Sequence, residues 1–298
     1  MSEFNSASCG GIPTISDTFA VGSLWTVDYA LQLASVGYSA AYLHTRERGI
    51  SYNLFTPPEG PNGAPGAWTT NPPFYGLLVT AEALRSQNGS IVTDLNIENS
   101  RENTSSTVSG YAIYDAGDKS VQQLVFFNFA NITSSANSST SFNVPAGTFN
   151  ATSGKVTVKY LHGNSMVEGS KIAWGGETFL GAGEGKLISS TAGWAPANVE
   201  LDCTGGCTIN VPAPGMAIVF AAVPVSPTAS DNSTNSANST SSTTHSQPSN
   251  ATQSGASGSS NNGTNKSGTL GSMHRESMIV SLVAVFLASV AISIGLNQ

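Results

Sequence analysis

The feature that most constrains this chain is a change of sequence pattern near residue 88. Before it, apolar residues recur at the spacing of helix turns. After it, short alternating segments rich in β-branched and aromatic residues follow one another, with turn residues between them. Helices followed by a run of short strands are typical of an α+β protein. We therefore expect a multidomain α+β chain with a boundary at 87/88.

The amino-terminal part begins with a predicted helix and strand. A helix is expected over residues 19–35, capped by Asp17 or Ser16 and ended by Gly37. Residues 38–44 then read as a short buried strand. A helix followed directly by an apolar strand is part of the repeating unit of parallel sheets and barrels.

A second helix follows after a long connection. The stretch 45–73 contains many glycines and prolines and exceeds the usual length of a loop. Loops of this length are usually functional or disordered. The helix is predicted over 74–85, with Pro72–Pro73 opening it and Asn71 as its cap.

Residues 88–225 are predicted to form an antiparallel β-sandwich. Turn residues separate its strands, and two glycine-rich stretches, 175–177 and 181–185, are expected as exposed loops. The strand segments are expected at 91–95, 109–114, 122–128, 140–144, 155–160 and 216–220.

A single carboxylate near the start of the chain suggests a catalytic position. Glu3 stands where a strand would end, just before the polar loop 6–11. In barrel enzymes, catalytic groups lie at the carboxyl ends of strands. Residues 1–87 are therefore predicted to be the last β/α units of a (β/α)8 barrel. Apolar residues of such isolated units should be partly exposed, namely Leu24, Trp25, Leu31, Ala41 and Leu43.

Composition points to a secreted or cell-surface protein. With a net charge of -7 and only 11 Lys and Arg residues, the chain offers no basic patch for nucleic acid. Glycosylation sequons indicate a secretory route. No export signal is visible at the first residues, so we expect an amino-terminal part to be missing. The sequons before the stalk are at Asn88, Asn103, Asn131, Asn137 and Asn150.

The cysteines allow a small-loop disulfide. Cys203 and Cys207 enclose Thr-Gly-Gly, which fits either a disulfide in an oxidising compartment or a turn with two free thiols. No second Cys or His pair has the spacing of zinc ligands, so no metal site is predicted. Cys9 is left unpaired by this assignment.

The carboxyl-terminal segments predict attachment to a membrane. Residues 226–277 are rich in Ser, Thr and Asn and are expected to be a disordered stalk. Residues 278–296 are a nearly continuous apolar run without a basic flank. Small residues and a polar spacer before this run fit the signal for a glycosylphosphatidylinositol (GPI) anchor. A single transmembrane helix is the alternative.

Several motifs resemble fungal members of glycoside hydrolase family 79, which includes β-glucuronidases and relatives of heparanase. The resemblance extends to about Val223 and implies a (β/α)8 barrel with an appended β-sandwich. It also implies a retaining mechanism, a glycan substrate bearing glucuronic acid, and no cofactor. The motifs are SEFNSASCGGIP at 2–13, ISDTF at 15–19, LWTVDYAL at 24–31, HTRERGISYN at 44–53 and PPFYG at 72–76.

By this resemblance, Glu3 corresponds to the catalytic nucleophile. A retaining glycosidase also needs a second carboxyl group as general acid and base. The family carries that glutamate on an earlier strand, which residues 1–298 do not include. Glu47, Glu59 and Glu82 are poor replacements, so this chain alone is expected to be inactive.

Three further residues are candidates for substrate binding. His44 at the strand end and Tyr52 in the loop after it could hydrogen-bond a sugar or its carboxylate. Arg46 or Arg48 could pair with a uronate, because a guanidinium matches a carboxylate. Two plainer interpretations stay open: a histidine satisfied by its neighbours, and an Arg-Glu-Arg surface network.

A second class of function also stays open. The chain could be a non-catalytic cell-surface carbohydrate-binding or cell-wall protein that uses its sandwich. Exposed aromatic residues would then form a binding platform, but Trp25 and Trp174 are expected in the core.

Overall fold

The computed structural model describes residues 3–57, 68–131, 138–149, 154–182, 185–190 and 193–221. The predicted stalk and apolar tail lie outside these residues, as do Glu59, Asn137 and Asn150. Within the described ranges, no helix combines the length and the apolar character needed to cross a membrane.

Two helical segments form where the apolar periodicity predicts them. The first runs from the π-helical η1 (Phe19–Trp25) into α1 (Thr26–Ser35), and the second is α2 (Pro72–Ala83). Pro72 and Pro73 open α2 as expected. The predicted cap of the first helix is wrong, because Thr18 caps η1 and its hydroxyl accepts a hydrogen bond from the Val21 amide at 3.4 Å. Asn71 stands at the N-cap position of α2 as predicted, although its side chain makes no capping bond.

The remaining chain forms antiparallel sheets, as the alternating pattern predicts. The large sheet has the order β10-β9-β8-β7-β13-β5-β4-β3, with β11 also paired to β7. Its strands are β3 (Ser90–Asp94), β4 (Val108–Asp115), β5 (Val121–Asn128), β7 (Lys155–Gly163), β8 (Ile172–Trp174), β9 (Glu177–Thr178), β10 (Ile188–Ser189), β11 (Val199–Asp202) and β13 (Gly215–Phe220). The two-stranded sheets pair β6 (Ser139–Val144) with β12 (Cys207–Pro212), and β1 (Phe55–Thr56) with β2 (Thr69–Thr70).

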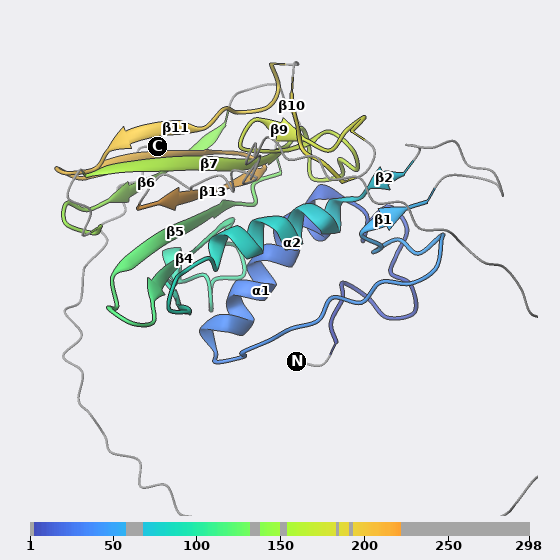
Figure 1. Cartoon of the computed structure of the whole chain (residues 1–298), viewed down its shortest axis with the longest axis horizontal. Helices are drawn as coiled ribbons and strands as arrows, with labels where there is room; N and C mark the ends of the chain where they lie inside the picture. Colours follow the sequence, from blue (N-terminus) through green and yellow to red (C-terminus); the bar gives the residue numbers. More distant parts are fainter. Residues whose placement is uncertain are drawn as a thin grey trace, which may run out of the picture. The chain divides into compact units, whose positions relative to one another are not determined.

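Both faces of the large sheet are covered. Residues of β6 and β12 share one hydrophobic core with one face, where Phe126 and Phe142 stack at 4.7 Å. The helical segments share a second core with the other face, and α1 and α2 lie along the sheet in Figure 1. The strands β8 to β12 were not anticipated from the sequence. Those from β8 to β11 are too short to show an alternating pattern.

The helices are better buried than the sequence led us to expect. Leu24 and Leu31 are fully buried in the core with the sheet, so the prediction that they are exposed is wrong. The reason is that the sheet, rather than further barrel elements, covers their apolar side. Trp25 is half-buried and Ala41 is exposed.

The predicted buried strand at 38–44 is also corrected. Its residues up to Tyr42 are exposed, and Leu43 joins Phe4 through an isolated parallel bridge. A strand is buried only when neighbours cover its faces. The segment pairs with the backbone of Phe4 through the Tyr42 carbonyl and the His44 amide.

A polar contact ties α2 to the sheet. Glu82 accepts a hydrogen bond from Trp174 Nε1 at 2.8 Å and an ion pair from Lys159 Nζ at 2.7 Å. Lys159 also lies 4.5 Å from the centre of the Trp174 ring. Trp174 is fully buried, which confirms its predicted place in the core.

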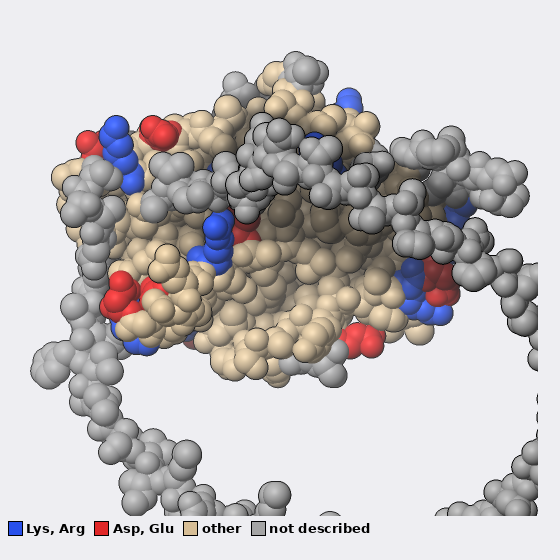
Figure 2. All heavy atoms as spheres, in the orientation of Figure 1, with Lys and Arg blue, Asp and Glu red and all other residues tan. Residues whose placement is uncertain are grey.

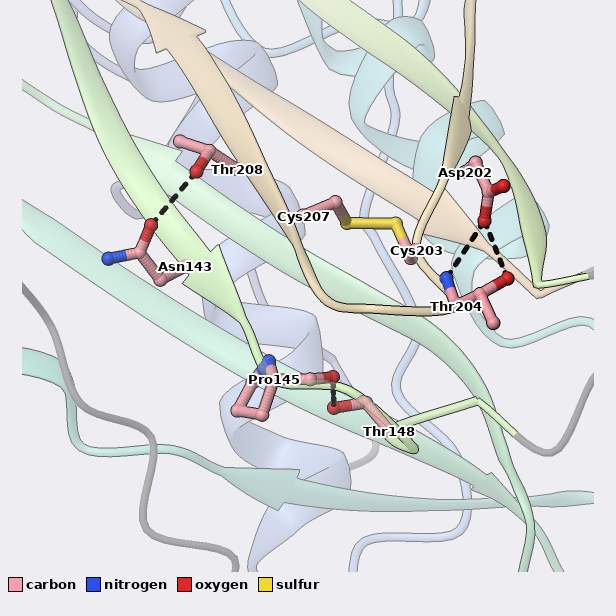
Figure 3. The surroundings of a disulfide bond; sticks show 8 residues. All are labelled: Asn143, Pro145, Thr148, Asp202, Cys203, Thr204, Cys207 and Thr208. Atoms are coloured by element: carbon pink, nitrogen blue, oxygen red, sulfur yellow. Dashed lines mark hydrogen bonds between the residues drawn. A yellow bond between two sulfur atoms is a disulfide. The ribbon is translucent and has the colours of Figure 1, made fainter.

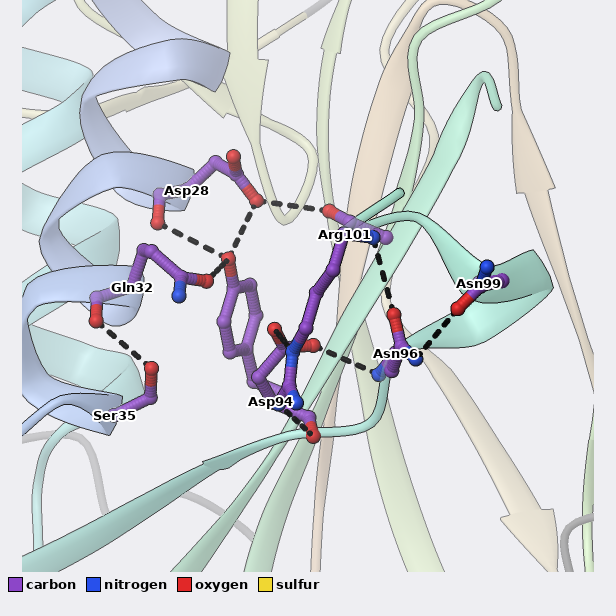
Figure 4. A network of polar contacts seen from close by, with 9 residues as sticks. Asp28, Gln32, Ser35, Asp94, Asn96, Asn99 and Arg101 are labelled. Carbon is purple, nitrogen blue, oxygen red and sulfur yellow. Dashed lines mark hydrogen bonds and ion pairs between the residues drawn. The ribbon is translucent and has the colours of Figure 1, made fainter. Parts of the chain in front are cut away.

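A second polar network ties α1 to the sheet (Figure 4). Asp28 Oδ1 accepts hydrogen bonds from Ser109 at 2.8 Å and from the Tyr111 hydroxyl at 2.9 Å. Arg101 binds Asp94 at 2.8 Å beside this pair. Burial raises the pKa of Asp28, the two hydroxyl donors oppose that rise, and the Asp94 charge adds to it. Burial and the Asp28 carboxylate raise the pKa of Tyr111.

This network predicts a pH-dependent stability. An acid whose pKa is higher in the folded state disfavours folding once it ionises. The contribution of Asp28 should therefore fall as the pH rises from about 3.9, its unfolded value, through the raised folded value. Urea unfolding across pH should show the wild type losing stability relative to Asp28→Asn in this window.

Asp202 supplies a control of opposite sign. Hydrogen bonds from the Thr204 hydroxyl and amide lower the pKa of Asp202, so its contribution should be lost as the pH falls. The stability of the wild type relative to Asp202→Asn should therefore fall as the pH is lowered, opposite to the behaviour expected for Asp28. Equal pH dependence of wild type and Asp28→Asn would contradict the assignment for Asp28.

Cys203 and Cys207 form a disulfide at the turn between β11 and β12. Figure 3 shows this turn beside the end of β6, where Thr208 donates to Asn143 at 3.0 Å. The bond closes the short Thr-Gly-Gly loop. Cys9 is a free, exposed thiol.

Candidate functional site

The strand ends that carry Glu3 and His44 lie side by side in parallel. The Phe4 amide donates to the Tyr42 carbonyl at 2.9 Å, and the His44 amide donates to the Phe4 carbonyl at 3.3 Å. Asn5 Nδ2 adds a bond to the His44 carbonyl at 2.7 Å. Because the pairing is parallel, Glu3 and His44 are brought to the same end of the two segments.

Glu3, His44 and Tyr52 form a contiguous cluster at this end. The Nδ1 atom of His44 lies 3.4 Å from Glu3 Oε1 and 3.1 Å from the Tyr52 hydroxyl. When Nδ1 of His44 carries a hydrogen, it faces the Glu3 carboxylate. In the other tautomer, Nδ1 accepts a hydrogen bond from the Tyr52 hydroxyl. The Glu3 side chain is 65% exposed, so its carboxylate is open to a ligand.

A glycine-rich turn packs closely against the Tyr52 ring. Tyr52 is 2% exposed. A side chain at Gly11 would meet both Ser16 and the Tyr52 ring within about 3 Å, and Gly11 also has a φ of +83°. Only glycine fits this approach, which explains the glycine at position 11 of the polar loop after Glu3.

Arg46 is engaged by its neighbour. Its Nη2 atom lies 2.8 Å from Glu47 Oε1, and both side chains are largely exposed. To bind a uronate, this guanidinium has to leave Glu47. The arrangement agrees with the simpler interpretation of an Arg-Glu surface pair and leaves the role of Arg46 in binding as a prediction.

Two of the three acidic residues considered as a second carboxyl are occupied, and the third, Glu59, lies outside the described residues. Glu47 is paired with Arg46, and Glu82 is bound to Trp174 and Lys159 in the helix–sheet layer. Within the described ranges, no three His, Cys, Asp or Glu side chains cluster closely enough to hold a metal ion. The site as described therefore contains one exposed carboxylate, that of Glu3, together with the rings of His44 and Tyr52.

Two asparagines were missed as members of the site. Asn53 is 3% exposed and bonds to several atoms of the loop that connects His44 to Tyr52. Asn71, at the N-cap position of α2, donates from its side-chain Nδ2 to the Asn53 carbonyl at 3.0 Å. These two residues carried only a weak signal in the sequence, because an uncharged asparagine in a polar loop looks like any other loop residue.

Other surface predictions fall on exposed positions. Asn88, Asn103 and Asn131 are exposed, as acceptor sites for a glycan must be. Figure 2 shows charged side chains in small separate groups on a largely uncharged face.

Trp25 stacks on Tyr29 at 5.0 Å next to Phe4, so it lies in an aromatic cluster.

Comparison with known proteins identifies the sheet region. Residues 110–218 match the glycosyl hydrolase family 79 C-terminal beta domain. No curated protein matches the chain significantly. Among solved structures, the chain is similar to a 4-O-α-L-rhamnosyl-β-D-glucuronidase from Fusarium oxysporum 12S, in its complex with Rha-GlcA. The identity is 22%, the TM-score is 0.56, and the match covers 73% of this chain but only 42% of that one.

Proposed function

Residues 110–218 form a family 79 C-terminal β domain, and on this basis we propose that the chain is the carboxyl-terminal portion of a retaining glycoside hydrolase. Its substrates are glycans that bear glucuronic acid. The observation that supports this best is the cluster of Glu3, His44 and Tyr52 at one end of a parallel strand pair. The glucuronidase similar in fold supports the choice of sugar.

The proposed chemistry assigns a role to each member of the cluster. In a retaining enzyme, a carboxylate attacks the anomeric carbon while a second carboxyl group protonates the leaving oxygen. Water then hydrolyses the glycosyl-enzyme ester, with the second group acting as base. Glu3 is the nucleophile, and its exposed carboxylate is accessible to the sugar. His44 and Tyr52 bind the sugar or its carboxylate, and Arg46 assists after release from Glu47.

The rest of the barrel supplies the second carboxyl group in this proposal. The two groups have to stand about 5–5.5 Å apart, and Glu47 and Glu82 are both occupied elsewhere. Residues 1–87 are accordingly the last β/α units of the barrel, and residues 1–298 alone are inactive.

Two measurements on the purified chain test the proposal. Free D-glucuronate should bind the wild type and should bind His44→Ala more weakly, whereas an aryl β-glucuronide should not be hydrolysed. Turnover that disappears in Glu3→Gln would refute the inactivity of this chain. Absence of glucuronate binding, together with binding of other sugars at the sheet, would favour the alternative of a non-catalytic carbohydrate-binding protein.

We also propose that the mature protein is held at the cell surface. The exposed sequons and the apolar run at 278–296 support this placement. In secretory cells, a version with an added export signal should be released from membranes by a phosphatidylinositol-specific phospholipase, because a GPI signal peptide is replaced by a glycolipid. Retention of the protein, with residues 278–298 still present, would identify a transmembrane helix instead.

A further inference from the structure

The loop between His44 and Tyr52 is organised around one buried side chain. Residues 45–53 contain no helix or strand, and Gly49 has a φ of +89°. A loop without regular backbone pairing needs side chains to satisfy its amides and carbonyls. Asn53, at 3% exposure, is in a position to do so.

Asn53 bonds to three consecutive residues of this loop. Its Oδ1 atom accepts from the Thr45 hydroxyl at 3.0 Å and from the Arg46 amide at 2.8 Å. Its Nδ2 atom donates to the Glu47 carbonyl at 2.8 Å. Both acceptor positions and one donor of the amide are thus used on the segment that follows His44.

The loop is also fixed to α2 through the backbone of Asn53. Asn71 Nδ2 donates to the Asn53 carbonyl at 3.0 Å and to the Thr56 hydroxyl at 2.9 Å. The backbone N–H of Asn71 donates to the Leu54 carbonyl at 2.9 Å. Asn71 therefore connects the end of the loop to the first turn of a helix packed on the sheet.

These contacts bear directly on the candidate site. Thr45 follows His44 in the chain and Tyr52 precedes Asn53, so the Thr45–Asn53 bond closes the loop at the residues next to the two rings. The rings meet at 3.1 Å between His44 Nδ1 and the Tyr52 hydroxyl. We propose that Asn53 is the positioning residue that holds His44 and Tyr52 together for glucuronate binding, without touching the sugar itself.

This proposal rests on the proposed function only for the ligand. The geometry can be tested without any ligand, since the contact between the two rings is observable in the free protein. A site fixed by its supporting residues loses affinity when they are removed, and small displacements have large effects.

The test uses the full chain as wild type, Asn53→Ala, Asn53→Asp and Asn128→Ala. Asn128 is a matched control, because it is 1% exposed and its Nδ2 donates to the Val211 carbonyl at 3.0 Å in the sheets. NMR of histidine-labelled protein, with His44 assigned through His44→Gln, reports the contact between the His44 and Tyr52 rings. Titration with free D-glucuronate reports affinity.

Asn53→Ala should shift the His44 signals, remove the ring contact and raise the glucuronate Kd by about tenfold or more. Asn128→Ala should lower the melting temperature but leave His44 unchanged. If Asn53→Ala does not fold, Asn53→Asp decides, because it keeps the acceptor and replaces the donor that faces Glu47 by a carboxylate oxygen.

An unchanged contact between the two rings in both Asn53 variants would overturn the proposal. So would an equal shift of the His44 signals in Asn128→Ala. If the wild type binds no glucuronate but Asn53→Asp disrupts the ring contact, the positioning role stands and the proposed function fails.

Discussion

Replacing Trp174 by alanine is expected to lower the free energy of unfolding by about 3–5 kcal/mol. The ring is fully buried in the core between the helices and the large sheet. Its loss leaves a cavity and removes the 2.8 Å bond from Nε1 to Glu82. Glu82 then keeps Lys159 as its partner but loses a buried donor. Chemical denaturation followed by circular dichroism measures the change.

Trp68→Ala is the matched control. Trp68 is 51% exposed, so the same substitution should change stability by about 0.5 kcal/mol or less. Equal denaturation midpoints for the two variants would show that the helices are not packed on the sheet through Trp174.

Replacing Glu3 by glutamine should abolish glycosidase activity in a longer form of the protein that supplies the rest of the barrel. Removal of a nucleophile reduces kcat by about 10⁴-fold or more, because an amide cannot form the covalent intermediate. A fluorinated glucuronide that traps the glycosyl-enzyme should label Glu3, as peptide mass spectrometry would show.

Glu47→Gln is the control for this substitution. Glu47 is exposed and paired with Arg46, so its loss should leave activity within about tenfold of the wild type. Labelling of another residue, or full activity in Glu3→Gln, would contradict the assignment of Glu3.

The sequence predicted the elements that depend on local pattern. The helix at 19–35 and the strands at 109–114 and 122–128 follow from apolar spacing, and Pro72–Pro73 marked the start of α2. Motifs between residues 2 and 76 resemble family 79, and residues 110–218 match the model of that family's C-terminal beta domain. Such signals are carried by neighbours in the chain, so they can be read without a structure.

The candidate site was predicted less completely. Glu3 and His44 were chosen for their chemistry and their place at strand ends, and Tyr52 for its place in the loop after His44. The structure brings the three together. Asn53 was not chosen, because nothing in a polar loop marks which amide becomes its buried centre. Its role exists only once the loop closes on itself.

Tertiary structure alone decided which surface covers the helices. The sequence shows that Leu24 and Leu31 need apolar partners, and barrel elements were the expected ones. In the structure, the sheet provides them, with Glu82 of α2 and Trp174 of β8 joined across 92 residues of chain. Periodicity along a chain identifies which face of an element is buried, but the partner of that face is set by contacts between distant residues, which no local pattern contains.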